Sequence, residues 1–224
     1  MVKEKNCSNR FSLREPKFFN KWRRLFLFLV ANVFYMIRFK LVYRMEVYGK
    51  ENIPKDGNYI VASNHLSTLD PVLVCSVMDR GVAYMAKKEL FKNPFMQWWL
   101  DWLGAFAVDR EKLGVSTIKT VMNIRETDWV MGIFPQGTRQ EPGIISDINK
   151  GFASLAKATK CNVLPVGIIG TEVAKRIPFS GKIIVKIGEV IPYSDDIDSM
   201  IEQWGKSLES LTGFEYRSSV QQKD

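Results

Sequence analysis

The sequence predicts a single α/β domain in which helices flank a central mixed sheet. Beyond residue 40, short runs rich in Val, Ile and aromatic residues alternate with stretches of helical periodicity. Such alternation is typical of a sheet covered by helices. At 224 residues, of which 46% are hydrophobic, the chain is long enough for one substantial core and short for two.

Seven strands and five helices are expected in this domain. The strands are expected at residues 41–48, 58–63, 82–87, 105–109, 129–134, 162–168 and 182–190, and the helices at 71–79, 93–103, 113–127, 148–159 and 195–211. No internal repeat or low-complexity linker separates them. The chain therefore divides into an N-terminal helical segment (1–40) expected to bind membranes, a main domain (41–214) and a polar tail (215–224).

The N-terminal segment combines basic and apolar residues. Residues 25–37 read LFLFLVANVFYMI, and basic residues lie on both sides of this run. Thirteen residues are fewer than the roughly 20 that span a bilayer as a helix. A helix that lies in the membrane interface or enters one leaflet fits this length. A core helix of a soluble domain is the alternative. No small-residue cleavage site follows the run, so we expect the N-terminus to be retained.

The net charge of +8, from 32 basic and 24 acidic residues, favours an anionic partner. A membrane surface, a phosphorylated substrate and a nucleic acid all satisfy the charge. The tryptophan-rich segment 95–103 favours lipid over nucleic acid, because tryptophan prefers the membrane–water interface. Trp98, Trp99 and Trp102 are therefore candidates for contact with the membrane or an acyl chain, and a helix buried against the sheet is the alternative.

Cysteine usage indicates a reducing compartment. Cys7, Cys75 and Cys161 are an odd number, widely spaced, without a CxxC pair. Neither a disulfide framework nor a metal site is expected. Together with the N-terminal segment, this places the protein at the cytoplasmic face of the cell membrane, as a peripheral or monotopic protein.

The chain has one histidine, His65, directly after the predicted strand 58–63. Strand ends of this kind build the sites of α/β folds. On one continuous helix His65 and Asp70 would lie about 140° apart around the axis, so only a turn can bring them together. Asp70 is suited to be an N-cap followed by Pro71, or the third residue of a capping box begun by Ser67. Spacing alone leaves catalysis and simple helix capping both open.

Four ordered motifs carry a resemblance to a known family. Asn64-His65-x4-Asp70 resembles the NHxxxxD motif of the glycerolipid acyltransferases, the lysophosphatidic acid acyltransferase family. LGAFAVDR at 103–110, FPQGTR at 134–139 and VLPV at 163–166 resemble its later motifs, in the same order. The resemblance covers roughly residues 40–190. Four motifs in order arise by chance far less readily than one.

The resemblance implies a catalytic pair. His65 would act as the general base that takes the proton of the acceptor hydroxyl, and Asp70 would orient the imidazole and stabilise the imidazolium. A thioester is already activated, so no acyl-enzyme is required.

The resemblance also implies an acceptor site. Arg110 and Arg139 would hold the acceptor phosphate with Gly137 and Thr138, because guanidinium offers two parallel donors to phosphate oxygens. The glycine turn could also present N–H groups to the tetrahedral oxyanion. Gln136, a possible acceptor contact, stands where the family pattern has glutamate, which keeps the size of the side chain and removes the charge.

The expected activity is transfer of a fatty acyl group from acyl-CoA or acyl carrier protein to 1-acylglycerol 3-phosphate, giving phosphatidic acid. No cofactor, metal or nucleic acid is expected. Glycerol 3-phosphate or another lysolipid is an alternative acceptor, and a non-catalytic membrane-binding module is an alternative of a different class. The chain contains no G-x-S-x-G, G-x-G-x-x-G or G-x-x-x-x-G-K-[ST] motif, which disfavours serine esterases and nucleotide-binding enzymes.

Overall fold

A seven-stranded sheet forms the centre of the computed structural model, which describes residues 11–108, 114–172 and 181–218. The strands follow the order β1 (Glu46–Tyr48), β8 (Ile184–Ile187), β7 (Asn162–Ile169), β2 (Tyr59–Ser63), β5 (Trp129–Ile133), β3 (Gly81–Lys87) and β4 (Phe106–Val108). Neighbours are parallel except β7 and β8. The predicted mixed sheet is confirmed.

Strand β2 lies in the middle of the sheet, and all five of its residues are buried. Val61 is in register with Gly132 of β5 on one side and Leu164 of β7 on the other. A parallel strand is buried on both faces when helices cover both, which explains its nearly continuous apolar sequence.

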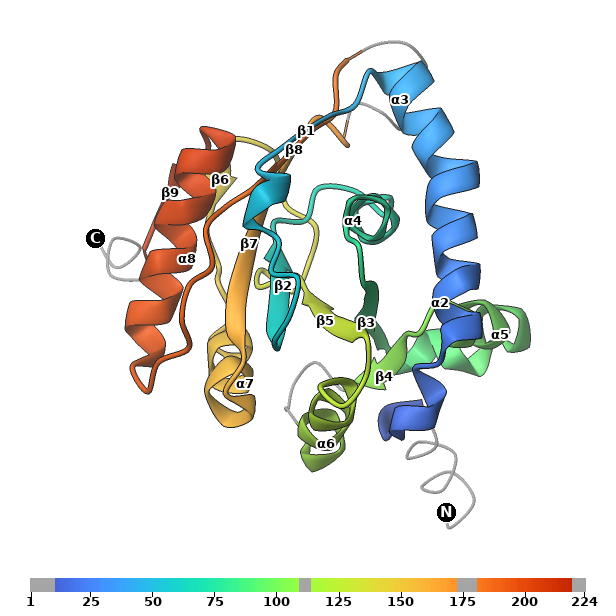
Figure 1. Cartoon of the computed structure of the whole chain (residues 1–224). Helices are drawn as coiled ribbons and strands as arrows, with labels where there is room; N and C mark the ends of the chain where they lie inside the picture. The colour runs from blue at the N-terminus through green and yellow to red at the C-terminus, as the bar shows by residue number, and fades with distance from the viewer. Residues whose placement is uncertain (1–10, 109–113, 173–180, 219–224) are drawn as a thin grey trace.

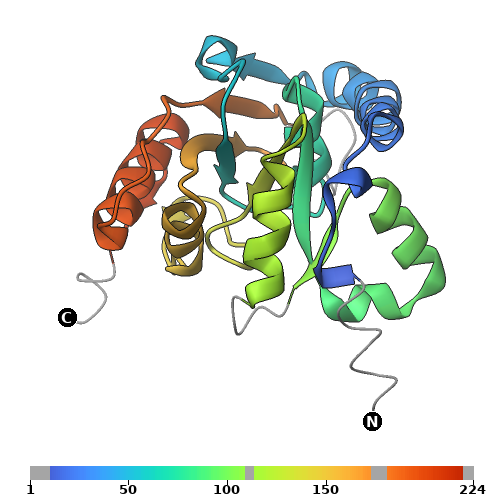
Figure 2. The same ribbon diagram turned by 60° about the horizontal axis from the view of Figure 1, so that its bottom comes forward.

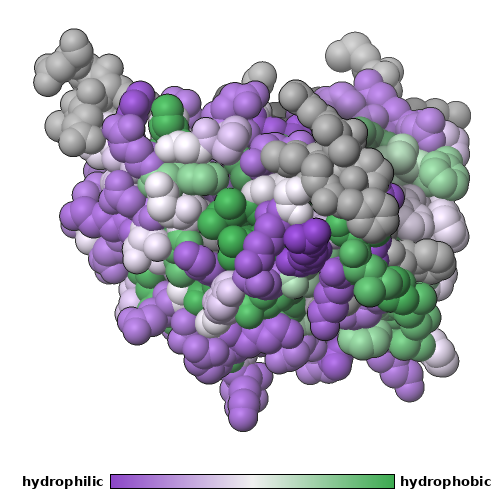
Figure 3. Space-filling model, turned by 90° about the horizontal axis from the view of Figure 1, so that it is seen from above, coloured by the Kyte–Doolittle hydropathy of each residue, from purple (hydrophilic) through white to green (hydrophobic). Residues whose placement is uncertain are grey.

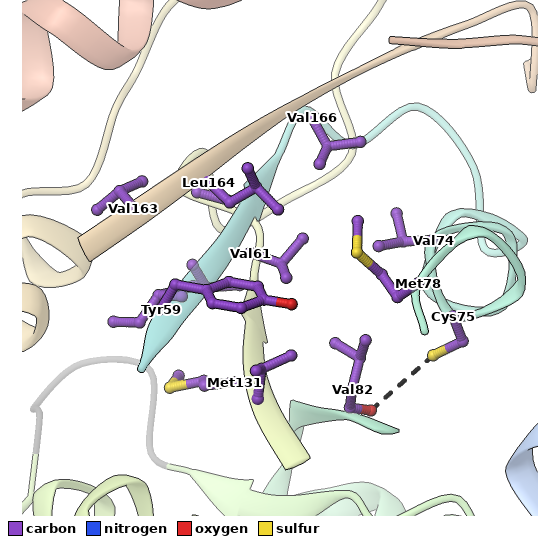
Figure 4. Close-up of a cluster of buried hydrophobic side chains, with 14 of the residues drawn as sticks. Tyr59, Val61, Val74, Cys75, Met78, Val82, Met131, Val163, Leu164 and Val166 are labelled. Atoms are coloured by element: carbon purple, nitrogen blue, oxygen red, sulfur yellow. Dashed lines mark hydrogen bonds between the residues drawn. The ribbon is translucent and has the colours of Figure 1, made fainter. Parts of the chain in front are cut away.

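Helices cover both faces of the sheet (Figures 1 and 2). Helix α4 (Asp70–Val77) covers one face together with the N-terminal helix, and α6 (Val115–Ile124), α7 (Gly151–Thr159) and α8 (Ile197–Thr212) cover the other. Val74, Cys75 and Met78 approach the side chains of Val61 and Val82 in the core beneath α4 (Figure 4). The carboxyl ends of the strands are thereby held between two helical layers.

Helix α8 is tied to the strand that leads to the candidate site. Met200, Trp204 and Leu208 recur every four residues and are fully buried, as expected for an amphipathic helix. The indole Nε1 of Trp204 donates to the carbonyl oxygen of Ala62, 3.0 Å away. This bond fixes the end of β2 three residues before His65.

The N-terminal helix is longer than the sequence predicted. Three consecutive stretches, α2 (Lys21–Phe28), the π-helix η2 (Leu29–Met36) and α3 (Ile37–Tyr43), form one helix, Lys21–Tyr43, of 23 residues. By length and composition this helix could cross a membrane. The thirteen-residue estimate counted only the apolar run and left out the basic ends, which are also helical.

One side of this helix packs against the domain and the other is exposed. Its buried residues are Leu27, Val30, Ala31, Phe39 and Tyr43, and its exposed apolar residues are Trp22, Leu25, Phe28, Leu29, Val33, Ile37 and Leu41. Hydrophobic side chains gather at the right of Figure 3, on the side where Figure 1 places α3. The helix is thus neither a buried core helix nor detached from the domain.

The predicted strand 41–48 is wrong at its beginning. Residues 41–43 form the last turn of α3, and β1 begins at Glu46. Val42 and Tyr43 are residue types that favour strands, but the burial of Tyr43 against the domain overrides that preference. Arg44 adopts a positive φ of 46° and ends the helix.

The remaining elements are short. They are η1 (Pro16–Phe18), η3 (Lys50–Asn52), η4 (Lys88–Lys92), α5 (Pro94–Trp102) and a second, two-stranded sheet of β6 (Ile144–Ile145) and β9 (Glu215–Tyr216). The second sheet was not predicted, and β9 joins the first residues of the expected polar tail to the domain.

Candidate active site

The candidate site lies where parallel strands β2, β5 and β3 end. His65 follows β2 by two residues, Phe134 follows β5 directly, and Lys87 is the last residue of β3. Because the carboxyl ends of parallel strands meet at one edge of the sheet, Lys87 and Phe134, which stand 22 and 69 positions after His65 in the sequence, lie near it here.

His65 and Asp70 form a hydrogen-bonded pair. Nδ1 of His65 lies 2.8 Å from Oδ2 of Asp70, which also accepts the backbone N–H groups of Leu66 and Ser67 at 2.7 Å each. The turn predicted to bring the two side chains together is confirmed. Asp70 is the first residue of α4 and Leu69 is the N-cap, so the expected N-cap role of Asp70 is wrong. Oδ2 of Asp70 accepts the backbone N–H of Ser67, which is the bond that the third helical residue makes to the first residue of a capping box.

The hydrogen bond defines which nitrogen of His65 is available for chemistry. A carboxylate accepts hydrogen bonds and does not donate them, so Nδ1 carries a proton, and in the neutral imidazole Nε2 then keeps its lone pair. The Asp70 side chain is completely buried and that of His65 is 16% exposed. The pair therefore presents one basic nitrogen toward the outside of the domain.

Two further contacts hold the loop that carries His65. The buried amide of Asn64 donates to the carbonyl of Ile168 in β7 at 2.8 Å and accepts the N–H of the same residue at 2.7 Å. The carbonyl of His65 accepts the N–H of Gln140 at 2.8 Å. Asn64 is thus a structural anchor, which accounts for an asparagine before the histidine.

His65 lies between two cavities. The larger, of about 580 Å³, has a polar mouth lined by His65, Lys87, Thr138 and Arg139 and an apolar interior lined mostly by aliphatic side chains. The smaller, of about 130 Å³, is lined by His65, Phe134 and the beginning of α7. The larger volume lies within the range of small-molecule sites, about 300–1,000 Å³.

The mouth of the larger cavity is positively charged. Lys87 and Arg139 are exposed, and neither forms an ion pair with a carboxylate in the part of the chain that the structure describes. No Asp or Glu is among the described residues that line this cavity. Such a mouth favours an anionic group beside His65.

Gly137 shapes the turn that carries Thr138 and Arg139. Its φ is +70°, a conformation that favours glycine, while a Cβ there would meet no atom within 4 Å. Its N–H donates to the carbonyl of Phe134 at 2.9 Å. The turn therefore requires glycine for its backbone conformation and not for space.

The structure brings together only part of the predicted acceptor site. Gly137, Thr138 and Arg139 line the larger cavity. Arg110 lies outside the described residues. Gln136 is 6% exposed and lines neither cavity; its amide nitrogen donates to the carbonyl of Ser146 at 3.4 Å, and its Oε1 has no partner among the described atoms.

The tryptophans of α5 pack around the N-terminal helix. The rings of Trp98, Trp99 and Trp102 lie 6.3, 5.9 and 5.3 Å from the ring of Phe26 in α2. No residue of α5 is buried, so the alternative of a core helix is wrong. Met96 and Leu100, on the same helix, line the larger cavity, which the tryptophans do not.

The apolar lining outside segment 95–103 and the ring behind His65 were not predicted from the sequence. Leu27, Val72, Leu100 and Leu103 line the larger cavity from three different segments. Phe134 was quoted only as part of a motif, although its ring stacks on His65. Their apolar character gave no sign of this location, since most residues of that type form the core.

Two buried groups near the site stay neutral. Burial raises the pKa of the Cys75 thiol to about 12, and burial, with the charge of Asp70 adding to it, raises the pKa of Tyr84 well above its ordinary value. Cys75 is therefore a poor nucleophile. Within the described ranges no group of three or more His, Cys, Asp or Glu side chains is arranged to hold a metal ion.

Known proteins similar to the chain share one activity class. Residues 44–169, more than half of the chain, match the family model described as Acyltransferase. The 1-acyl-sn-glycerol-3-phosphate acyltransferase of Bacillus subtilis is 34% identical over 67% of this chain and 75% of that protein. Its counterpart from Streptococcus pneumoniae is 32% identical over 66% of this chain and 56% of that protein. The chain therefore matches only about half the length of some of these relatives.

A solved structure agrees with the sequence relatives. The crystal structure of the 1-acyl-sn-glycerophosphate (LPA) acyltransferase PlsC from Thermotoga maritima is similar with a TM-score of 0.63 and 27% identity, covering 84% of this chain and 79% of that one. The family model, these relatives and the shared fold therefore define an enzyme of the O-acyltransferase class. More particularly, the chain belongs to the acyltransferase family whose curated members include the 1-acyl-sn-glycerol-3-phosphate acyltransferases.

Proposed function

We propose that the protein transfers a fatty acyl group from an acyl thioester to the free hydroxyl of 1-acylglycerol 3-phosphate, giving phosphatidic acid. The observation that carries the proposal is the imidazole of His65, oriented by its hydrogen bond to Asp70, at the boundary between a cationic mouth and an apolar cavity. The names of the relatives support the same acceptor.

His65 and Asp70 supply the proton chemistry. Nε2 takes the proton of the acceptor hydroxyl while the oxygen attacks the thioester carbonyl, and Asp70 stabilises the imidazolium that forms. The tetrahedral intermediate then expels the thiolate, which takes the proton from the imidazolium as the C–S bond breaks. Because the Gly137 N–H is bonded to Phe134, an oxyanion donor from this turn must come from a neighbouring N–H.

Arg139 and Lys87 bind the acceptor phosphate in this proposal. Both are exposed at the cavity mouth, without an ion pair among the described residues, and no carboxylate competes there. A guanidinium gives two parallel bonds to phosphate, whereas an ammonium acts as a point charge. Arg110 remains a predicted second arginine of this site.

The fatty acyl chain occupies the apolar part of the larger cavity. Leu27 comes from the N-terminal helix, Val72 from α4, and Leu100 and Leu103 from the α5 region. Burying methylene groups against such a wall stabilises the bound chain by about 0.8 kcal/mol each. Both coenzyme A and acyl carrier protein remain candidate donors.

The N-terminal helix binds the protein to the membrane surface in this proposal. While Leu27, Phe39 and Tyr43 are buried against the domain, the helix cannot be surrounded by lipid, and its exposed apolar side offers a face for one leaflet. This supports a monotopic protein, and the cytoplasmic face follows from the expected reducing compartment.

Release of the free thiol tests the proposal. Vesicle-bound protein is given acyl-CoA or acyl carrier protein with 1-acylglycerol 3-phosphate, glycerol 3-phosphate or other lysolipids. We expect release with the first acceptor and a loss of about 10²-fold or more in His65→Ala. Release that is absent with every acceptor, while vesicle binding persists, would support a non-catalytic membrane module instead.

Arginine substitutions test the phosphate contact. Arg139→Ala should raise KM for the phosphorylated acceptor far more than for the donor, and Arg139→Lys should restore part of the effect because the charge remains. Arg217→Ala is the matched control, since Arg217 is a surface arginine paired with Glu215. Equal effects on both substrates would argue against the contact.

A further inference from the structure

We propose that two aromatic rings, Phe134 and Tyr84, fix the plane of the His65 imidazole for proton transfer, and that Gly132 gives Tyr84 the space to do so. The three are positioning residues. The proposal rests on the proposed role of His65 as the base and adds a second support to the one that Asp70 provides.

Three rings are stacked at the carboxyl edge of the sheet. The imidazole of His65 lies 4.0 Å from the ring of Phe134, centroid to centroid, at an angle of 18°. Phe134 in turn lies 5.2 Å from Tyr84 at 13°. The order of the rings follows the order of their strands, β2, β5 and β3. The stack is therefore held in place by the register of the sheet.

The stack supplies a restraint that the Asp70 bond does not. One hydrogen bond to Nδ1 fixes the direction of that N–H but does not by itself define the plane of the ring about the line joining Nδ1 and Oδ2. A flat ring at contact distance prevents this turn and covers one face of the imidazole. Nε2 is then held in one direction, and proton transfer depends strongly on position.

Gly132 makes room for the outer ring. A Cβ at this position would lie 2.6 Å from the Cε1 and Cζ atoms of Tyr84 and from Cγ1 of Val82, too close for any real side chain. The glycine is the fourth of the five residues of β5, and a glycine within a strand weakens it, so a close approach is the physical reason for it. Tyr84 can therefore lie flat over the strand and support Phe134.

The tyrosine contributes its ring and not its hydroxyl. The Oη atom is buried and has no hydrogen-bond partner among the described atoms, while its neutral form is favoured because burial raises the pKa of Tyr84. A phenylalanine would offer the same stacking face without an unpaired buried hydroxyl. This separates the proposal from a proton-relay role for Tyr84.

Kinetics of four variants test the stack. Phe134→Leu and Gly132→Ala should each lower kcat by about tenfold or more, with KM for both substrates changed less than threefold, because position and not binding is lost. Phe134→Trp and Tyr84→Phe should keep most of kcat. Phe106→Leu is the control for lost core packing, because Phe106 is fully buried in β4 and lines neither cavity.

The single histidine gives a readout that does not require turnover. In an untagged chain with isotope-labelled histidine, the ring protons of His65 should show the upfield shift of a proton above an aromatic face, and Phe134→Leu should remove it. Loss of the shift in Phe106→Leu as well would mean that general loosening, and not the stack, moves the ring.

Three outcomes overturn the proposal. The first is a kcat of Phe134→Leu within threefold of the parent, and the second is a loss of kcat that Phe106→Leu reproduces at the same melting temperature. The third is a Tyr84→Phe variant as impaired as Tyr84→Leu, which would assign the role to the hydroxyl. Full activity of His65→Ala would instead refute the proposed function, whatever the spectrum of the free protein shows about the stack.

Discussion

Asp70→Asn should lower both stability and turnover by amounts that follow from its contacts. Oδ2 accepts three bonds, from His65 Nδ1 and from the N–H groups of Leu66 and Ser67, while Oδ1 is buried without a partner among the described atoms. An amide oxygen in the Oδ2 position keeps the three bonds but makes them neutral, at a loss of about 1 kcal/mol each. The NH2 group takes the Oδ1 position as an unpaired buried donor, which costs about 1–3 kcal/mol.

The lost charge offsets part of this cost, because a buried carboxylate carries a desolvation penalty that the amide lacks. We expect a net loss of about 2–4 kcal/mol, which is a fall in melting temperature of roughly 5–15 °C for a domain of this size. Turnover should fall by about 10²-fold or more in addition, since a neutral amide stabilises an imidazolium poorly.

Calorimetry and thiol release on the same preparation separate the two effects. Rates are measured well below the melting temperature of the variant, and Asp79→Asn, an exposed aspartate just beyond α4, is the control. A folded Asp70→Asn enzyme with kcat within threefold of the parent would refute the role of Asp70. An unchanged melting temperature would refute the expected loss of stability from the weakened hydrogen bonds and the unpaired donor.

Three further predictions concern two buried side chains, Gln136 and Cys75, and the exposed face of the N-terminal helix. Gln136→Glu places a buried charge against the carbonyl oxygen of Ser146, so the melting temperature should fall at pH 7 and recover as the pH is lowered. A higher kcat without that fall would instead indicate that the site lacks the carboxylate of the family pattern at this position. Because burial raises the pKa of Cys75 to about 12, its contribution to stability is complete below the unfolded pKa of about 8.5 and is lost as the pH rises toward 12, by up to about 1.4 kcal/mol per pH unit. Urea denaturation at pH 8 and 10.5 should show a smaller decline in Cys75→Ala, and equal declines would contradict this. Leu29→Ser combined with Val33→Ser should weaken vesicle binding by about tenfold or more, whereas high salt should weaken the binding of the parent protein only partly. The control is Val115→Ser, at an exposed position on α6, which should leave vesicle binding unchanged. Equal sedimentation of all forms with vesicles would place the membrane contact elsewhere.

Truncation of residues 1–40 is a poor test of membrane binding for this fold. Phe39 is fully buried against the domain, and Leu27 lines the larger cavity. Removing them would open the core and the candidate acyl site together with the exposed face. Substitutions confined to that face leave the domain intact.

Most of the sheet could be predicted because its strands are apolar and separated by helical patterns. The strands 58–63, 129–134 and 162–168 agree with β2, β5 and β7 to within one residue at each end. The error at 41–43 arose where Val42 and Tyr43, residue types with strand propensity, continue a helix whose packing lies outside any local window. Local pattern decides structure only where tertiary contacts agree with it.

The candidate site likewise contains residues whose proximity could be predicted from the sequence and residues whose proximity could not. His65 and Asp70 are five residues apart, so a turn predicted from Pro71 was sufficient to bring them together. Tyr84 and Phe134 are 50 residues apart and meet only because β3 and β5 are neighbours in the sheet. Strand order is set by the whole fold, and the sequence contains no local signal for it.

Leu27 lies on a helix that exposes apolar side chains on one side and contributes to the lining of the candidate acyl cavity on the other. If this helix rests on the membrane as proposed, the cavity opens beside the leaflet that holds both the acceptor and the product. The encounter with the acceptor then takes place in two dimensions. The rate should depend on the mole fraction of the acceptor in the surface, so that adding inert phospholipid slows the reaction at constant bulk concentration, and the product can spread sideways in the leaflet without entering water.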